Sequence, residues 1–228
     1  MRLNLLLYKL ECKIRRFAIE GLMKSITICM LIVFAADFLM MMYSGGELPS
    51  INYYLAFSRS HILKGQVWRV ISFIIAYPQS SNVFFTLLAL YFFYWTGSSV
   101  ESYWGKARFN LYYLFGIIGT LIAGFIAGSI SNTYLNLSLF LAFAVMFPNQ
   151  QVMLFFFIPI KVKWIGIAEG VFLFYILCLS LFMRDFATVA AIIAALINFI
   201  IFFGYDLINK IKRAYEEYKW RKNNNYYY

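Results

Sequence analysis

Hydrophobic runs of membrane-spanning length are the feature of this sequence that most constrains its fold. A helix that crosses the hydrocarbon core of a bilayer needs about 20 predominantly apolar residues, and it satisfies its own backbone hydrogen bonds there. The apolar runs lie at residues 25–43, 82–100, 109–130, 133–147, 164–183 and 187–207. They predict an all-α fold, a polytopic membrane bundle of six transmembrane helices.

Composition favours a membrane protein over a soluble one. Hydrophobic residues make up 63% of the 228 positions and charged residues only 13%, whereas about a quarter of the residues in soluble domains are charged. The net charge of +10 raises the question of a nucleic acid partner. The basic residues gather at the chain ends and between the apolar runs, which is typical of membrane topology. We therefore expect the lipid bilayer as a partner and no nucleic acid.

The chain divides into three regions. Residues 1–24 form a basic segment with apolar side chains at helical spacing, which predicts an amphipathic helix on the inner leaflet. A solvated helix that packs on the bundle is the alternative. Residues 25–207 form the six-span domain, and residues 208–228 form a basic tail whose last residues, NNNYYY, are expected to be disordered.

The distribution of basic residues predicts the orientation of the chain. With six crossings, 16 of the 20 Lys and Arg residues lie on the side of the two termini. Loops rich in Lys and Arg stay in the cytoplasm, so we expect both termini to be cytoplasmic. We also expect a multi-pass protein of a bacterial cell membrane. A seventh span at residues 68–77 would move the basic tail outside, so this stretch is assigned to the first outer loop, residues 44–80.

Small residues at four-residue spacing predict which helices pack closely. They let helix backbones approach one another in lipid, where no hydrophobic force drives association. In the third, fourth and sixth runs these residues are Gly116, Thr120, Gly124, Gly128, Ser138, Ala142, Ala190, Ala194 and Asn198. These three helices are predicted to form the packed core. Such a stripe serves internal and external packing equally, so the oligomeric state stays open.

Polar side chains within the apolar runs raise a functional question. A charge inside a membrane is costly and by default marks a functional site. Asp37 and Glu169 lie within about two helical turns of a predicted membrane boundary, which favours a structural role, such as a latch between Asp37 and Arg69. The alternative is a small transporter, whose polar cavity would be lined by Asp37, Asn136, Glu169 and Asn198.

Residues for metal or disulfide chemistry are sparse. The cysteines Cys12, Cys29 and Cys178 have no paired or metal-type spacing, which predicts no disulfide and no zinc site. His61, in the first loop, is the only histidine, and a zinc site needs several such ligands. We expect no metal and no cofactor, and we expect His61 to be a solvated loop residue.

Several short motifs occur in the order and spacing of one known family. Residues 65–69 (GQVWR) match a GxxWR element, and residues 101–109 match an ExxWGxxRF junction. Residues 88–93 (LALYFF), 142–149 (AFAVMFPN) and 158–161 (IPIK) match the end of a second helix, the end of a fourth helix and the loop after it. Together these motifs resemble the rhomboid superfamily, which includes the rhomboid intramembrane proteases and the non-proteolytic Derlins.

The resemblance covers about residues 65–207. It implies a rhomboid-like fold of six transmembrane helices with both termini inside. The motif residues to which it assigns structural roles are Gly65, Trp68, Arg69, Glu101, Trp104, Gly105 and Arg108.

The resemblance fails at the positions that carry rhomboid chemistry. The family's catalytic serine, in a GxSG motif, falls near Thr133 without either flanking glycine, and its sixth-helix histidine falls near Ile197 or Asn198. The histidine and asparagine of the second helix, which help to stabilise the oxyanion, fall at Asn82 and Thr86. The resemblance therefore implies a catalytically inactive relative.

Two hypotheses of function follow. The first is a Derlin-like pseudoprotease that binds transmembrane segments of client membrane proteins without cleaving them, with the loop around Trp68 and Arg69 as its place of action. The second is a divergent intramembrane serine protease that uses Thr133 or Ser138. A hydroxyl nucleophile needs a base within hydrogen-bond reach, and the only histidine, His61, lies in a loop.

Overall fold

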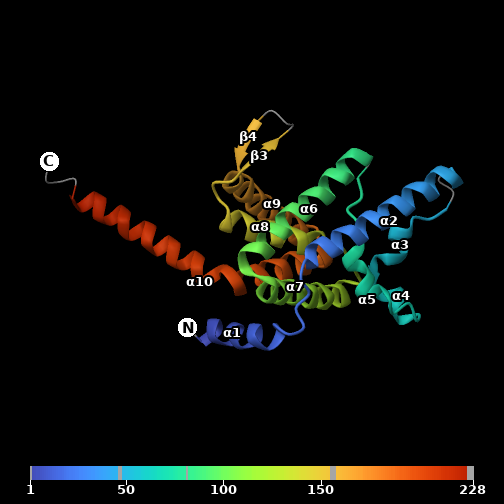
Figure 1. Ribbon diagram of the computed structural model, residues 1–228, viewed down its shortest axis with the longest axis horizontal. Helices are drawn as coiled ribbons and strands as arrows, with labels where there is room; N and C mark the ends of the chain where they lie inside the picture. Colours follow the sequence, from blue (N-terminus) through green and yellow to red (C-terminus); the bar gives the residue numbers. More distant parts are fainter. Residues whose placement is uncertain (1, 46–47, 81, 155–157, 225–228) are drawn as a thin grey trace.

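The computed structural model describes residues 2–45, 48–80, 82–154 and 158–224, which fold mainly into helices (Figure 1). Five helices are long and apolar enough to cross a membrane. They are α2 (Leu22–Ser44), α6 (Val83–Trp104), α7 (Lys106–Ala127), α9 (Val162–Phe182) and the first part of α10, Phe186–Gly204. The predicted helical bundle with membrane-spanning helices is confirmed for these five.

The fourth predicted span is shorter than a membrane helix needs. Helix α8 (Thr133–Met146) has 14 residues, which is about 21 Å of helix against a hydrocarbon core of about 30 Å. It packs against α6, α7, α9 and α10, and most of its side chains are buried. Five of the six predicted transmembrane helices are therefore long enough to cross a membrane, and α8, which matches the predicted run 133–147 to within one residue, is a short central helix.

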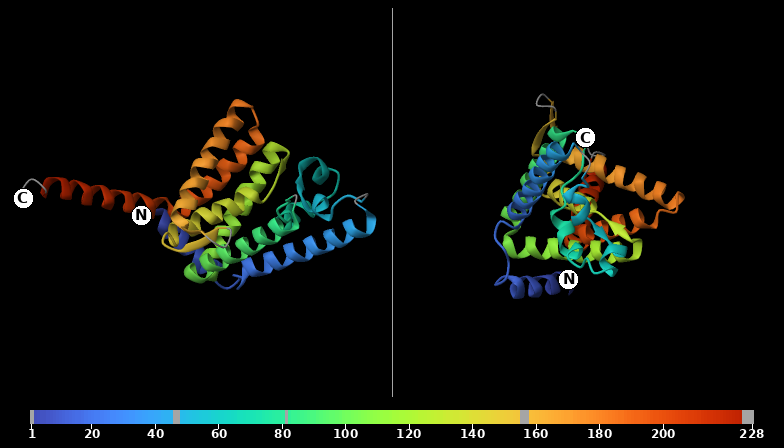
Figure 2. Two further views of the ribbon diagram at one scale, coloured as in Figure 1. Left: turned by 90° about the horizontal axis from the view of Figure 1, so that it is seen from above. Right: turned by 90° about the vertical axis from the view of Figure 1, so that its right-hand side faces the viewer.

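The bundle has two unlike ends, which Figure 2 shows from two sides. At the first, which we call the loop end, α2 finishes and α6 and α8 begin. Its connecting elements are α3 (Ile51–Leu55), β1 (Phe57–Ser58), α4 (Arg59–Leu63), α5 (Arg69–Ser72), the 3-10 helix η1 (Phe73–Ile75) and β2 (Ser129–Ile130). Strand β1 pairs antiparallel with β2. The stretch 68–77 contributes only α5 and η1, in agreement with its assignment to the first loop.

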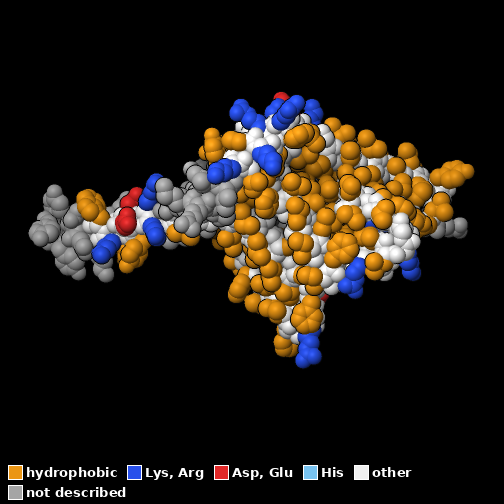
Figure 3. All heavy atoms as spheres, turned by 90° about the horizontal axis from the view of Figure 1, so that it is seen from below, with side chains coloured by type: hydrophobic (Ala, Val, Ile, Leu, Met, Phe, Trp, Pro, Cys, Tyr) orange, Lys and Arg blue, Asp and Glu red, His pale blue; other side chains and the backbone are white. Residues whose placement is uncertain are grey.

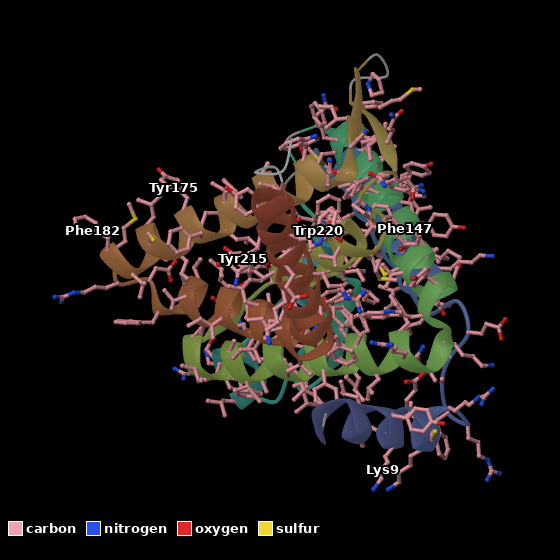
Figure 4. All side chains as sticks on the ribbon, turned by 90° about the vertical axis from the view of Figure 1, so that its left-hand side faces the viewer. Lys9, Phe147, Tyr175, Phe182, Tyr215 and Trp220 are labelled. Carbon is pink, nitrogen blue, oxygen red and sulfur yellow. The ribbon has the colours of Figure 1, made fainter. Side chains whose placement is uncertain are left out.

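The second end, which we call the terminal end, is where both chain ends leave the bundle. Helix α1 (Arg2–Ile14) packs on α7 (Figure 4), with Leu7 and Ile14 against the core. The strands β3 (Gln151–Leu154) and β4 (Ile158–Lys161) form an antiparallel hairpin between α8 and α9. This hairpin was not predicted from the sequence.

Helix α10 (Phe186–Asn224) continues far beyond the last predicted span. Its last part projects away from the bundle (Figure 1). The tail was predicted to be a separate region with a disordered end, but the helix runs through it as far as Asn224, and residues 225–228 lie outside the described residues. The reason is local: residues 208–224 contain no Gly or Pro and are rich in Lys, Arg and Glu, which are good helix formers.

The small residues of α7 face its neighbours. A Cβ on Gly116 would lie 3.0 Å from the amide nitrogen of Asn198 on α10 and closer still to Leu135 on α8. Gly124 lies against the ring of Phe57 in β1. Glycine at these two positions therefore lets three elements approach the α7 backbone.

Two further small residues lie at the end of α7 and in α10. Gly128 ends α7 with a φ of 95°, a backbone conformation that glycine adopts readily. Ala194 of α10 packs opposite Gly119 of α7.

Outside this core, hydrophobic side chains cover the body of the bundle (Figure 3), as expected of a surface that faces lipid.

Candidate functional site at the loop end

The carboxylate of Asp37, buried in the last third of α2, organises the loop end. It accepts hydrogen bonds from the backbone N–H groups of Ile51 at 2.7 Å and Asn52 at 3.3 Å. The hydroxyls of Ser50 and Tyr77 also donate to it, the latter at 2.7 Å. These donors include the first backbone amides of α3, which have no partner inside that helix. The carboxylate therefore holds the first loop on α2.

Tyr77 and Asn52 complete this network. The Asn52 amide donates to the carbonyl of Tyr77 at 3.0 Å and accepts from its N–H at 3.1 Å. Burial and the hydrogen bond to Asp37 raise the pKa of the Tyr77 hydroxyl to about 12, because ionisation would place a second negative charge beside the carboxylate. Two distant parts of the loop are thus tied to one point on α2.

Arg69 is a clamp inside the loop. Its side chain is buried, with 2% exposed, and its guanidinium donates to the carbonyls of Tyr53 at 2.8 Å and Ala56 at 2.7 Å. Its Nε donates to the side-chain oxygen of Gln66 at 2.7 Å. The predicted latch between Asp37 and Arg69 is wrong, because the guanidinium bonds to backbone carbonyls and the carboxylate to α3 and Tyr77.

The other residues of the GxxWR motif shape the surface of the loop. Gly65 turns the chain between α4 and α5 with a φ of 100°, which favours glycine. The indole N–H of Trp68 donates to the carbonyl of Tyr54 at 3.4 Å, while about half of the side chain, 52%, is exposed. Val67 and Ile71 are exposed beside it. The motif therefore combines a buried arginine with an exposed apolar surface, as suits a membrane interface.

The loop is also fastened to α7 and α8. The pairing of β1 with β2 places Phe57 opposite Ile130. Asn132, which precedes α8, is buried and donates its amide to the carbonyls of Ile74 at 3.1 Å and Ala76 at 2.8 Å. The position next to the aligned rhomboid serine thus holds the end of the first loop in place.

A groove of about 830 Å³ lies between the end of α2 and the start of α6. Its polar lining comes from Asp37, Ser50, Tyr77, Gln79, Ser80 and Thr86. Its apolar lining comes from Phe34, Phe38, Met40, Met41, Leu48 and Val83. Phe38, Met41 and Val83 are also exposed on the bundle surface, so the groove is accessible from the lipid side. Methionine side chains adapt to apolar partners of different shape.

The candidate nucleophiles Thr133 and Ser138 have no basic side chain as a hydrogen-bond partner among the described residues. Thr133 accepts a hydrogen bond from the Ser131 hydroxyl at 2.9 Å. Ser138 is buried, lies 3.0 Å from the Tyr112 hydroxyl and donates to the carbonyl of Leu135 at 2.9 Å. A phenol and a carbonyl do not remove a proton at neutral pH, so neither serves as the base that a hydroxyl nucleophile requires.

The other positions aligned with rhomboid chemistry have structural roles. The side chain of Asn82 accepts from the N–H two residues on and caps α6. Thr86 is buried and its hydroxyl donates to the Asn82 carbonyl at 3.5 Å. Asn198 is buried against Gly116, and about half of Ile197 is exposed. Asn82 thus caps a helix, Thr86 and Asn198 make packing contacts, and Ile197 forms part of the surface that faces lipid.

His61 is bonded within its own turn. Its Nδ1 lies 2.9 Å from the Ser58 hydroxyl, and its ring packs edge-on against Tyr53. Such contacts between a hydroxyl and a residue of the following turn are common where helices begin. No carboxylate among the described residues is bonded to the imidazole to orient it, as a catalytic triad requires. The prediction of a solvated loop residue holds for its place in the loop, but the side chain is half-buried.

The ExxWGxxRF motif acts at the terminal end. The buried carboxylate of Glu101 accepts hydrogen bonds from the N–H groups of Gly21 at 2.8 Å, Leu22 at 3.2 Å and Met23 at 3.4 Å. These amides begin α2 and lack partners inside the helix, and the helix dipole favours a negative charge at this position. Glu101 therefore caps the first span.

The rest of this motif joins three further helices. Gly105, with a φ of 79°, connects α6 to α7. The Trp104 ring stacks on Phe203 of α10 at 4.9 Å between centroids, and the Arg108 guanidinium lies 4.8 Å from its centre. The geometry gives these residues roles in joining helices.

The polar residues within the spans are not joined in one hydrogen-bonded site. Asp37 is satisfied at the loop end, whereas the buried polar atoms of Asn136, Asn198 and Glu169 have no hydrogen-bond partner among the described residues. Asp37 lines the groove between α2 and α6, and Asn198 lines a different one between α7 and α10. These two residues do not share the single polar cavity that a transporter built around all four would need.

Metal-ligating side chains are dispersed in the part of the chain that the structure describes. No three His, Cys, Asp or Glu residues gather there as a metal site would require. The cysteines Cys12, Cys29 and Cys178 are free and exposed.

Comparison with protein family models, with curated proteins and with solved structures finds no match for this chain. The molecule is thus defined by its own features, a helical bundle with five membrane-spanning helices and a hydrogen-bonded loop at one end. A rhomboid-like relationship remains a prediction that rests on the sequence motifs.

Proposed function

We propose that this protein is a rhomboid-like pseudoprotease that binds transmembrane segments of client membrane proteins without cleaving them. The observation that carries the proposal is the groove between α2 and α6, where a methionine-containing wall faces a polar lining. Hydrogen bonds to Asp37 join Ser50 and Tyr77 of this lining to α2. Arg69 supports the lining indirectly, because it fixes the part of the loop between Ser50 and Tyr77. A client helix would lay its apolar side against Met40 and Met41, with its polar side chains toward Gln79 and Ser80.

Binding of a client helix would be favourable because lipid tails offer no hydrogen-bond partners to polar side chains. A polar side chain of a transmembrane helix gains about 1 kcal/mol from a hydrogen bond to another membrane helix. The groove offers hydroxyl and amide groups close to a membrane boundary, at the end of α2 and the start of α6. Client helices with a polar residue near that boundary would therefore bind more tightly than wholly apolar ones.

Binding without cleavage is supported by the surroundings of the hydroxyls. Ser138 is bonded to a phenol and a carbonyl, and Thr133 to another hydroxyl. A protease would have to bring a base to one of these positions.

In this proposal α8 completes a sixth crossing and the terminal end faces the cytoplasm, as the excess of basic residues favours. The short elements of the first loop, α3, α4, α5 and η1, would sit unevenly at the membrane boundary and distort the bilayer there. A local distortion of this kind would ease the lateral entry of a client helix into the groove.

Site-specific photocrosslinking tests the proposal. A photoreactive amino acid replaces Met41 in the groove or, as a matched control, Phe174, which is exposed on α9. The full-length protein is reconstituted in nanodiscs with a transmembrane peptide that carries one Asn near the boundary at the loop end. We expect crosslinks from position 41 that exceed those from position 174 and that decline with an all-leucine peptide. Equal yields at both positions would contradict binding in the groove.

A further inference from the structure

A second cavity, of about 300 Å³, lies at the terminal end between α1 and the turn from α6 to α7. Helix α1 contributes Tyr8 and Glu11, and Arg15, the residue after its end, continues the same face because its N–H bonds to the Glu11 carbonyl at 2.9 Å. The turn contributes Trp104 and Lys106. Two segments far apart in the sequence therefore meet around one space, and each brings a cation to it.

The two cations are only lightly engaged by the protein. No hydrogen bond or ion pair joins the Arg15 side chain to another described residue. Lys106 pairs with Glu20 at 3.3 Å, but both side chains are exposed, and such pairs contribute little. Glu11 is the one carboxylate in the lining. The cavity lining therefore has a net positive charge. Arg15 is available to a ligand, and Lys106 can exchange a weak, exposed ion pair for one.

The position of the cavity indicates where that ligand comes from. Lys106 is the first residue of one membrane-spanning helix and Trp104 the last of another, so the cavity lies at a membrane boundary. Tryptophan is enriched at this depth, where lipid headgroups lie. Basic pockets beside membrane helices suit phosphate headgroups.

We propose that this cavity binds the phosphate headgroup of an anionic phospholipid, with Arg15 and Lys106 as its cationic ligands and the Tyr8 phenol as a further donor. The site does not depend on the function proposed for the loop end. It would fix α1 to the bundle through a lipid, because one phosphate would bridge α1 and the turn before α7.

Native mass spectrometry of the full-length protein in detergent tests this site. The probes are phosphatidylglycerol, zwitterionic phosphatidylcholine and inorganic phosphate. We expect phosphatidylglycerol to bind tightest, and Arg15→Gln or Lys106→Gln to weaken it about tenfold, which is the effect of losing one charge-assisted hydrogen bond. Lys9→Gln is the matched control, since the Lys9 side chain points away from the bundle (Figure 4), and its affinity should stay unchanged.

Two variants that should strengthen lipid binding distinguish loss of the site from loss of the fold. Glu11→Gln removes a repelling charge, and Glu20→Gln frees Lys106, so each should strengthen binding about two- to fivefold. Weaker binding in Glu11→Gln would overturn the proposal. So would equal affinity for phosphatidylcholine, or a loss in Lys9→Gln as large as that in Arg15→Gln. Inorganic phosphate that binds as tightly as the lipid would overturn the assignment to a headgroup.

Discussion

Two pairs of charged residues, one at each end of the bundle, differ in burial and in partners. At the loop end, Asp37 and Arg69 are buried and bond to the protein's own backbone and side chains. At the terminal end, Arg15 and Lys106 are exposed around a cavity. Asp37 and Arg69 therefore stabilise the fold of the first loop, whereas Arg15 and Lys106 are accessible to a ligand.

The largest effect is expected from Arg69→Ala. This change removes a buried guanidinium and leaves the carbonyls of Tyr53 and Ala56 without their donor. We expect a loss of about 3 kcal/mol in the free energy of unfolding, measured by thermal or denaturant unfolding in detergent. Binding of transmembrane peptides in the groove should fall with it.

Arg15→Ala is the counterpart at the terminal end. Because this side chain is exposed, its removal should change the free energy of unfolding by no more than about 0.5 kcal/mol. If Arg15→Ala destabilised the protein as much as Arg69→Ala, the contrast between the two ends would be wrong.

Glu101→Ala removes a buried charge from the terminal end. The carboxylate caps the first amides of α2, and loss of such a cap costs about 1–2 kcal/mol. The same unfolding measurement should place this variant between Arg69→Ala and Arg15→Ala. A neutral result would mean that the cap does not hold α2.

The smallest expected effect is a pH dependence of the loop end. The pKa of Tyr77 is raised from 10.0 to about 12, so its hydroxyl stabilises the fold below pH 10 and this contribution is lost as the pH rises through about 12. Protease digestion of the first loop should therefore accelerate over this range in the wild type. Tyr77→Phe should lack this alkaline step, and an unchanged step in the variant would assign it to another group.

The membrane-spanning helices could be predicted because hydropathy acts over about 20 residues and does not depend on tertiary contacts. The bounds of α8 were predicted to within one residue, since the mostly apolar run at 133–147 forms a helix that ends at Met146. The β3–β4 hairpin that follows it was not predicted. The continuation of α10 beyond Gly204 follows from the local propensity of the tail.

The partners of buried polar residues could not be predicted. An ion pair between Arg69 and Asp37 was predicted because opposite charges attract. Each side chain instead bonds to uncharged groups that come within reach only when the loop is folded. Asn52 and Asn132 were missed for the same reason, since a loop asparagine has no signature until the carbonyls it binds are in place. The cavity at the terminal end also needs the fold, because it joins residues about 90 positions apart.

Recovery of a bound transmembrane peptide tests whether this protein binds client helices without cleaving them. The full-length protein in nanodiscs is incubated with the Asn-bearing peptide, and the peptide is then identified by mass spectrometry. We predict that it is retained by the wild type, recovered at full length, and retained poorly by Arg69→Ala. Peptide fragments that form with the wild type and disappear in Ser138→Ala or Thr133→Ala would contradict the account, as would a failure of the wild type to retain the peptide.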